Sequence, residues 1–177
     1  MNMQSFKVSR FLGLAVVGAA LVCVMTGAFA AGDANHDEDM RAVNNFRLND
    51  KMIAEYTAVL KNFVVLRKQH PEVAKQMDED SESANNKTFA QIAVSVNKFP
   101  LVRDAITRSG MSVTDYILCS FAVLQAGMRA MAVSEGASTS TVPSGIPTDN
   151  LHYYQANEAR FDAVSKLMQQ MNSNSDQ

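Results

Sequence analysis

The chain has 177 residues, enough for one domain, and 47% of them are hydrophobic, which is typical of a globular protein and excludes a disordered one. Its 16 basic and 18 acidic residues give a net charge of −2, which argues against a nucleic-acid partner. Glycine and proline are scarce and no segment alternates β-branched residues, so the sequence predicts helices rather than a β-sandwich or barrel.

The first 30 residues have the pattern of a secretory signal peptide. Lys7 and Arg10 give a basic start, an uncharged apolar run follows over 11–25, and the small residues Ala28 and Ala30 fit a signal-peptidase site. An uncleaved membrane anchor is the alternative. Cleavage after Ala30 leaves 147 residues with 14 basic and 18 acidic side chains. We therefore expect an exported protein, periplasmic or extracellular.

Apolar residues at steps of three and four predict a series of helices in the remaining chain. The elements expected in chain order are a flexible N-terminus over 31–39, helices over 37–69 and 71–77, an acidic loop over 78–87, helices over 89–99 and 100–110, a central apolar helix over about 113–134, a linker over 137–148, a last helix over roughly 150–171 and a flexible tail over 173–177. The sequence thus predicts one all-α domain over 40–172, a compact bundle of four to six helices around the central one.

Residues 111–133 are the most apolar stretch outside the leader and raise the question of a membrane span. Placed on a helix, the apolar side chains from Val113 to Met131 cover one broad side, and Gln125 and Arg129 lie on the other. Because a charge inside a membrane is costly, these two residues argue against a span. We interpret the segment as the centre of the bundle, and we expect no stable membrane span after the leader is removed.

Small and amide side chains interrupt the apolar stripes and form a candidate binding site. Ser120 and Gly127 lie seven residues apart on the central helix and would leave a shallow notch. A buried amide without a partner costs about 1–3 kcal/mol, so buried asparagines need partners. The hypothesis is a ligand pocket lined by Asn45, Asn49, Tyr116, Ser120, Gly127 and Asn157. The alternative is ordinary packing, with the Ser120 hydroxyl bonded to a carbonyl one turn back and the amides paired or at the solvent.

Residues suited to catalysis or metal binding form no recognisable motif. His36, His70 and His152 are far apart in the sequence, and the chain has no Cys-x-x-Cys, phosphate-loop or nucleophile-elbow motif. Cys119 lies among apolar residues, where we expect an unreactive thiol. The sequence therefore predicts a non-enzymatic protein without a metal or a cofactor.

Three segments resemble a type of small exported bacterial helical protein of unknown function. They are GMSVTDYIL at 110–118, LQAGM at 124–128 and DNLHYYQANEARF at 149–161. The resemblance covers residues 40–170 and implies a bacterial all-α protein, of the envelope or secreted, with no activity to carry over. We expect an interaction module that binds an unknown protein through the 137–148 loop and nearby helix ends. A carrier of a small apolar ligand held between helices is the alternative, and a homo-oligomer is compatible with both.

Overall fold

The structure is a computed structural model and describes residues 34–82, 87–134 and 147–173. Within these ranges every regular element is a helix, as the sequence predicts. The helices are α2 (Ala34–Asn45), α3 (Asp50–Gln69), α4 (Pro71–Glu82), α5 (Phe89–Asn97), α6 (Pro100–Thr107), α7 (Val113–Ser134), α8 (Thr148–Ala156) and α9 (Glu158–Ser173). The predicted leader and most of the predicted linker and tail lie outside the described residues.

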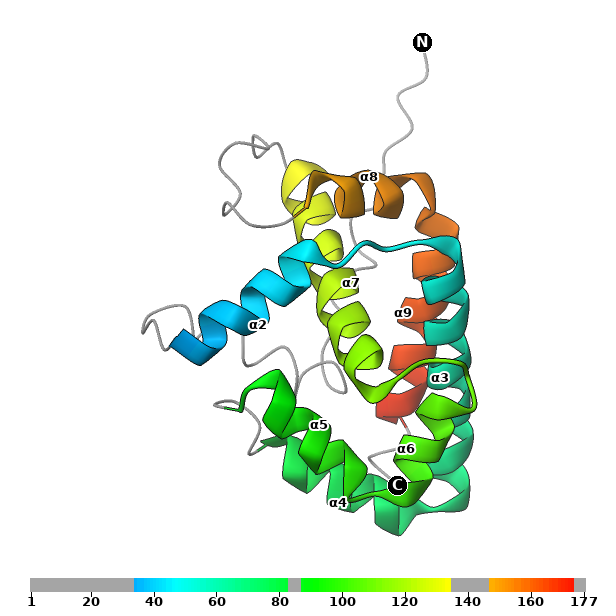
Figure 1. The fold of residues 1–177 in the computed structure, drawn as a ribbon. Coiled ribbons are helices and arrows are strands. Elements are labelled where there is room, and N and C mark those ends of the chain that lie inside the picture. Colours follow the sequence, from blue (N-terminus) through cyan, green and yellow to red (C-terminus); the bar gives the residue numbers. More distant parts are fainter. Residues whose placement is uncertain (1–33, 83–86, 135–146, 174–177) are drawn as a thin grey trace.

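The central position in this arrangement belongs to α7, against which α2, α3, α5, α6 and α8 pack. α9 runs alongside α3, while α4, α5 and α6 lie at one end of the molecule and α8 lies at the other (Figure 1). The described part of the chain contains eight helices where we expected four to six. Two of the six predicted helices are each divided, which accounts for the two additional helices.

The first division separates α2 from α3 at Asn49, inside the predicted helix over 37–69. Asn49 has an extended backbone (φ −151°, ψ 170°), and its side-chain oxygen accepts a hydrogen bond from the Met52 backbone N–H at 3.0 Å. This is the geometry of an N-cap, and the acidic Asp50 that follows suits the first turn of a helix. The connection over 46–49 turns the chain, so that α2 leaves the line of α3 and lies across α7 (Figure 1).

The second division falls at Asn157, inside the predicted last helix. Asn157 ends α8, where its backbone N–H donates to the Tyr154 carbonyl and its side-chain amide donates to the Tyr153 carbonyl at 2.9 Å. α9 begins at the next residue, Glu158. A residue that we had placed on an apolar stripe is therefore a helix end, because its amide bonds to the backbone of the preceding turn.

Two stretches that we expected to lack structure are partly helical. α4 continues through the predicted acidic loop as far as Glu82, and α2 begins at Ala34, inside the predicted flexible N-terminus over 31–39. On α3, the Arg67 side chain is 6% exposed and donates to both carboxylate oxygens of Asp78 on α4, the longer bond being 3.1 Å. This cross-helix ion pair holds the acidic part of α4 against α3.

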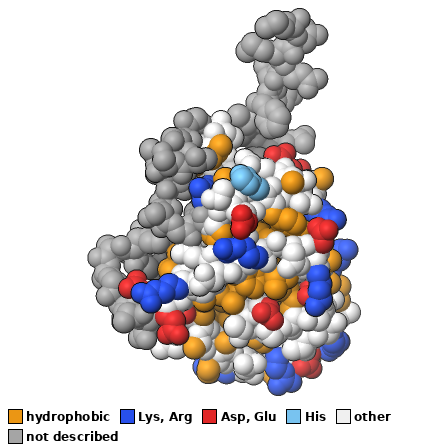
Figure 2. Space-filling view, turned by 45° about the horizontal axis from the view of Figure 1, so that its top comes forward, with side chains coloured by type: hydrophobic (Ala, Val, Ile, Leu, Met, Phe, Trp, Pro, Cys, Tyr) orange, Lys and Arg blue, Asp and Glu red, His pale blue; other side chains and the backbone are white. Residues whose placement is uncertain are grey.

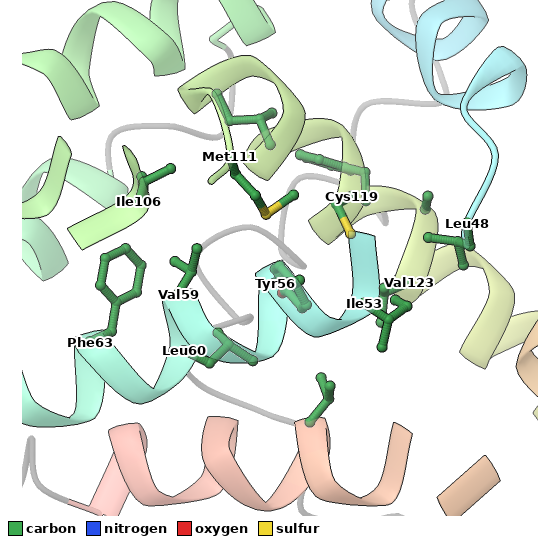
Figure 3. Packing of buried hydrophobic residues seen from close by; sticks show 14 of the residues in the cluster. Leu48, Ile53, Tyr56, Val59, Leu60, Phe63, Ile106, Met111, Cys119 and Val123 are labelled. Carbon is green, nitrogen blue, oxygen red and sulfur yellow. The ribbon is translucent and has the colours of Figure 1, made fainter. Parts of the chain in front are cut away.

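The hydrophobic core is built around α3, which is buried on two sides. Figure 3 shows Tyr56, Val59 and Phe63 pointing from α3 towards α6 and α7, where they meet Ile106, Met111 and Cys119, while Leu60 points towards α9. Each large apolar side chain that is fully buried stabilises the fold by about 1.5–3 kcal/mol. The apolar residues whose spacing predicted the helix over 37–69 are thus the residues through which α3 packs into the core.

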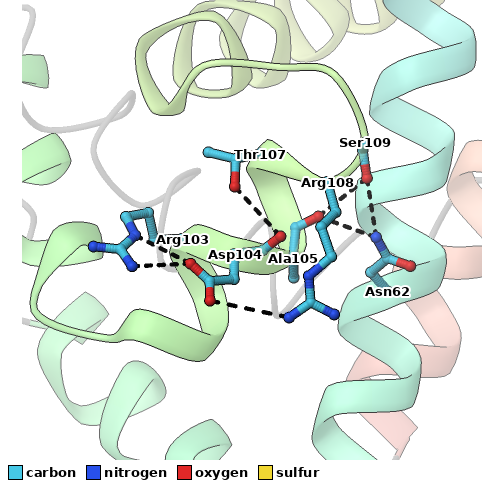
Figure 4. A network of polar contacts seen from close by, with 7 residues as sticks. All are labelled: Asn62, Arg103, Asp104, Ala105, Thr107, Arg108 and Ser109. Carbon is cyan, nitrogen blue, oxygen red and sulfur yellow. Dashed lines mark hydrogen bonds and ion pairs between the residues drawn. The ribbon is translucent and has the colours of Figure 1, made fainter.

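A group of polar contacts fixes the end of α6 to α3 (Figure 4). The Asn62 side-chain amide on α3 donates to the Ala105 carbonyl and to the Ser109 hydroxyl oxygen, both at 3.0 Å. Gly110 follows with φ +92°, a conformation that residues with a side chain rarely adopt, and turns the chain towards α7. The start of the central helix is thereby set by a glycine and by contacts to α3.

Candidate functional site

α7 buries two of its polar side chains and exposes two of its methionines, so our predicted orientation was wrong for the second half of this helix. Gln125 is 3% exposed and Arg129 is 8% exposed, whereas Met128 is 41% exposed and Met131 is 43% exposed. The prediction placed this helix at the centre of the bundle but left Gln125 and Arg129 on a side without neighbours, whereas helices pack against α7 from several sides. We call Met128 and Met131 the methionine edge.

By its length and composition α7 is long and apolar enough to cross a membrane, and among the described residues it is the one helix of which this is true. The central helix of a water-soluble bundle meets the same two conditions. Here α7 is packed by other helices, and it carries Gln125 and Arg129 inside the protein. The structure thus gives α7 the place in a helical bundle that we expected for it.

Among the described residues, α2 and α7 each bury a side-chain oxygen that accepts no hydrogen bond. Gln125 Oε1 on α7 and Asn44 Oδ1 on α2 are buried and accept no hydrogen bond from the described part of the chain. A buried acceptor without a donor costs about 1–3 kcal/mol. Val43 is completely buried, whereas most other described α2 side chains are partly or fully exposed. α2 is therefore held on α7 by a small apolar contact.

The notch that we predicted at Ser120 and Gly127 is filled by other parts of the protein. A Cβ atom built on Gly127 would lie 3.5 Å from the ring of Tyr154 on α8, and this ring stacks on Phe161 with centroids 4.2 Å apart. The Ser120 hydroxyl donates to the Tyr116 carbonyl one turn back, at 2.8 Å, as the packing alternative predicted. The small residue Gly127 thus allows α8 to approach α7 closely.

Tyr116 belongs to an aromatic cluster between α7 and α3. Its ring centroid lies 5.7 Å from that of Tyr56 and 5.6 Å from that of Phe63. Burial raises the pKa of the Tyr116 hydroxyl to about 12, raises the pKa of the Cys119 thiol to about 12, and raises the pKa of Tyr56 well above its ordinary value. These groups are therefore neutral at physiological pH, and the thiol has no thiolate character with which to react.

The predicted asparagines lie near one corner of the fold, where the α2–α3 connection meets α8 and α9, but they serve local structure. Asn45 ends α2 and is exposed, Asn49 is the exposed N-cap of α3, and Asn157 ends α8. Tyr116 and Gly127 lie elsewhere, against α3 and α8 respectively. The six predicted residues are thus distributed over three places rather than gathered in one pocket.

Asn150 is the residue at this corner that the sequence analysis missed. It is 1% exposed, its side-chain oxygen accepts a hydrogen bond from the Leu48 backbone N–H at 2.9 Å, and its amide nitrogen donates to the Phe46 carbonyl at 2.9 Å. An exposed ion pair between Arg47 and Asp149 at 3.3 Å lies beside it. No local signal could reveal this role, because the two bonded partners lie 102 and 104 residues away in the sequence.

A second polar group joins the start of α3 to α8 and α9. The Asp50 carboxylate accepts hydrogen bonds from the Tyr153 hydroxyl at 2.8 Å and from the Arg160 guanidinium. These bonds lower the pKa of Asp50 and raise the pKa of Arg160. Asp50 and Arg160 are exposed, so solvent screens their attraction, and the group orients the corner more than it stabilises it.

The described residues contain no group of three or more His, Cys, Asp or Glu side chains that could hold a metal ion.

Comparison of the chain with protein-family models, curated proteins and solved structures finds no match. The two features that remain as functional candidates are the methionine edge of α7 and the corner at which Asn150 bonds to the α2–α3 connection.

Proposed function

We propose that the chain is an exported, non-enzymatic interaction module of the bacterial envelope, and that the methionine edge contacts a partner protein. The observation that carries this proposal is the exposure of Met128 and Met131 on a helix that buries Gln125 and Arg129. In water, methionines inside and polar side chains outside would be the more stable arrangement. Burying a methionine stabilises a fold by about 1.5–3 kcal/mol, whereas a buried polar group needs hydrogen-bond partners. A helix with this orientation retains apolar surface for a contact outside the chain.

The chemistry of methionine suits such a contact. Its side chain is flexible and polarisable, and it adapts to apolar surfaces of different shape. Figure 2, which turns the α8 end of the molecule towards the viewer, shows hydrophobic side chains exposed between charged ones on this face. Met128 and Met131 are large apolar side chains that lie three residues apart on α7 and are both exposed, and exposed apolar side chains that lie together mark sites of protein interaction. The export and the envelope location rest on the leader and on the resemblance of three segments to exported bacterial proteins.

The carrier of a small apolar ligand is the less well supported function. The notch that would hold the ligand is occupied by Tyr154, whose ring contacts Gly127 and stacks on Phe161. A ligand would have to displace this ring from both neighbours before it could bind. A contact at the methionine edge requires no such rearrangement, which is why we favour the interaction module.

Site-specific photo-crosslinking in the source organism tests the proposal. A photoreactive phenylalanine analogue replaces Met128 or Met131, and the control carries it at Val65 on α3, which is 50% exposed. We expect the same protein adduct from both methionine positions and none from Val65. Adducts with lipid alone, or no protein adduct at either methionine position, would contradict the proposal.

A charge variant and its matched control give the second part of the test. Met128→Glu combined with Met131→Glu should abolish the complex detected by crosslinking, whereas Val65→Glu combined with Val94→Glu, on other exposed apolar positions, should leave it intact. Native mass spectrometry of the purified protein then separates the two functions. Additional small-molecule mass on the single chain would favour the carrier instead.

A further inference from the structure

The connection between α2 and α3 interrupts a stretch that is otherwise compatible with one helix. Its residues are Phe46, Arg47, Leu48 and Asn49, and none of them is the glycine or proline that ordinarily marks a sharp break. The spacing of apolar residues led us to predict an unbroken helix through this point. The bend is therefore set by the N-cap of Asn49 on one side and by the two hydrogen bonds from Asn150 on the other.

Asn150 replaces two hydrogen bonds that an unbroken helix would make. In such a helix the Leu48 N–H would donate to the Asn44 carbonyl, and the Phe46 carbonyl would accept from the Asp50 N–H. In the structure the Leu48 N–H donates to the Asn150 side-chain oxygen, and the Phe46 carbonyl accepts from the Asn150 amide nitrogen, both at 2.9 Å. The buried Asn150 side chain thus bonds to the Leu48 N–H and the Phe46 carbonyl in the bent form. In a straight helix these two groups would instead bond to the backbone.

We infer that residues 34–69 form a two-state element, bent or straight, and that the straight form lets two copies of the chain exchange α2. In the bent form α2 lies on the α7 of its own chain. In the straight form α2 extends from α3 and lies on the α7 of a second copy, and the two chains form an exchanged dimer. The inference does not depend on the methionine edge.

The second copy is the occupant because α2 is the helix that this surface of α7 already binds. An α2 helix from another copy has the same sequence and can remake the same contacts, including the burial of Val43. At its other end α2 is held by the Asp39 carboxylate, which accepts a hydrogen bond from the Phe89 N–H at the start of α5, at 2.9 Å. This contact can also form between chains.

Val43 is the one residue of α2, among those whose burial is described, that is completely buried, so releasing α2 exposes little apolar surface. Val43 supplies its completely buried side chain, while Asn44 Oδ1 is buried without a donor. Asn150 then decides between the two forms. It favours the bent form, because straightening removes both of its bonded partners. Without the Asn150 side chain, the Leu48 N–H loses its partner in the bent form, and the Phe46 carbonyl keeps only the 3.4 Å bond from the Arg47 guanidinium. In the straight form both groups regain backbone partners within the helix.

The principal experiment measures the oligomeric state of the processed chain with Asn150→Ala, by light scattering during size-exclusion chromatography. We expect the dimerisation constant to rise by at least about tenfold, the equivalent of 1.4 kcal/mol. Asn157→Ala is the matched control, because it removes an amide that bonds within α8, and it should leave the constant unchanged. An unchanged constant for Asn150→Ala would overturn the inference.

A reporter on α2 distinguishes exchange from other kinds of association. A thiol introduced by Val43→Cys is buried when α2 lies on any α7, and Cys119 is completely buried, so neither should react with a thiol reagent. Exchange predicts that Asn150→Ala gives dimers in which the introduced thiol stays protected. A reactive thiol, in monomers or in dimers, would show that α2 has left α7 without exchange and would overturn the inference.

A proline at position 50 tests whether straightening is the route. Proline is favoured at the first position of a helix and holds the preceding residue in an extended conformation, which Asn49 already has. Asp50→Pro therefore permits the bent form and blocks the straight one, while Asp50→Ala removes the same carboxylate and blocks neither. With Asn150→Ala, we expect monomers for the proline and dimers for the alanine. Dimers in both would overturn the inference.

A second variant tests the equilibrium between the bent and straight forms if Asn150→Ala does not fold. Asn49 is exposed, and Asn49→Ala removes only its hydrogen bond to the Met52 N–H, which helps to start α3 after the bend. We expect a several-fold rise in the dimerisation constant. No rise for this variant would count against the two-state element on its own.

Discussion

The ring of Tyr154 on α8 lies against Gly127 on α7 at a distance that leaves room for one methyl group. A Cβ atom on this glycine would be 3.5 Å from the ring, an ordinary van der Waals separation. Because alanine favours helices more than glycine does, we expect Gly127→Ala to raise the free energy of unfolding by about 0.5–1 kcal/mol. Urea denaturation measures this change. A loss of stability would mean that α8 needs a closer approach than the geometry indicates.

Gly110 should respond to the same substitution with the opposite sign. Its φ of +92° is strained for any residue with a side chain, and a Cβ atom there would lie 2.8 Å from Glu55 Oε1. We expect Gly110→Ala to lower the free energy of unfolding by about 1–2 kcal/mol. Gly110→Asn should cost less, because asparagine tolerates positive φ better than alanine does. Equal stability of both variants and the parent protein would contradict the role of this turn.

The elements that the sequence predicted well are those whose limits are set by local chemistry. The central helix begins at Val113, as predicted, because its apolar run starts just after Gly110, and it is helical over the described residues as far as Ser134. The end of α3 before Pro71 is equally local, since a residue that precedes proline is disfavoured in a helix. The all-α class follows from the same periodicity.

The elements that the sequence could not predict depend on distant partners. Asn150 bonds across more than 100 residues to the α2–α3 connection, and nothing near it in the chain indicates that role. The burial of Gln125 and Arg129 likewise follows from the number of helices around α7, which periodicity does not report. The asparagines at 49 and 157 were visible as polar interruptions, but whether an amide caps a helix or lines a pocket depends on the backbone that it meets.

Because several buried groups have raised pKa values, we expect the free energy of unfolding to fall at high pH. The folded Cys119 thiol has a pKa of about 12, so between about pH 9 and 12 it stays protonated in the folded chain and ionises in the unfolded one. The unfolded state then binds fewer protons, and the free energy of unfolding falls by up to about 1.4 kcal/mol per pH unit for this group. Above pH 10, Tyr116 and Tyr56 add to the decline.

Urea denaturation between pH 7 and pH 11 measures this dependence. Cys119→Ala removes the contribution of the thiol and should flatten the curve between pH 9 and pH 10, while the decline above pH 10 remains. Identical slopes for the variant and the parent protein between pH 9 and pH 10 would show that the thiol ionises in the folded state.

If residues 1–30 are a signal peptide, as we propose, the exported protein has a defined processed form. Export from a bacterial host should give a chain that begins at Ala31 and contains 147 residues, which intact-mass spectrometry can identify. Ala28→Arg places a large charged residue where signal peptidase requires a small one, and it should leave the 177-residue form attached to the membrane. A full-length product from the unaltered sequence would favour the uncleaved anchor instead.

The ion pair between Arg67 and Asp78 should respond unequally to loss of its two members. Arg67 is almost completely buried, whereas the Asp78 side chain is 40% exposed. Asp78→Ala takes two charge-assisted hydrogen bonds from a guanidinium that water reaches poorly, and we expect a loss of about 2 kcal/mol in the free energy of unfolding.

Arg67→Met has a different effect, because it fills the buried space with an apolar side chain and leaves behind a carboxylate that water can solvate. We expect a change within about 1 kcal/mol. Thermal and urea unfolding of both variants measure the difference. A larger loss for Arg67→Met than for Asp78→Ala would show that the arginine stabilises the joint between α3 and α4 through its other contacts more than through Asp78.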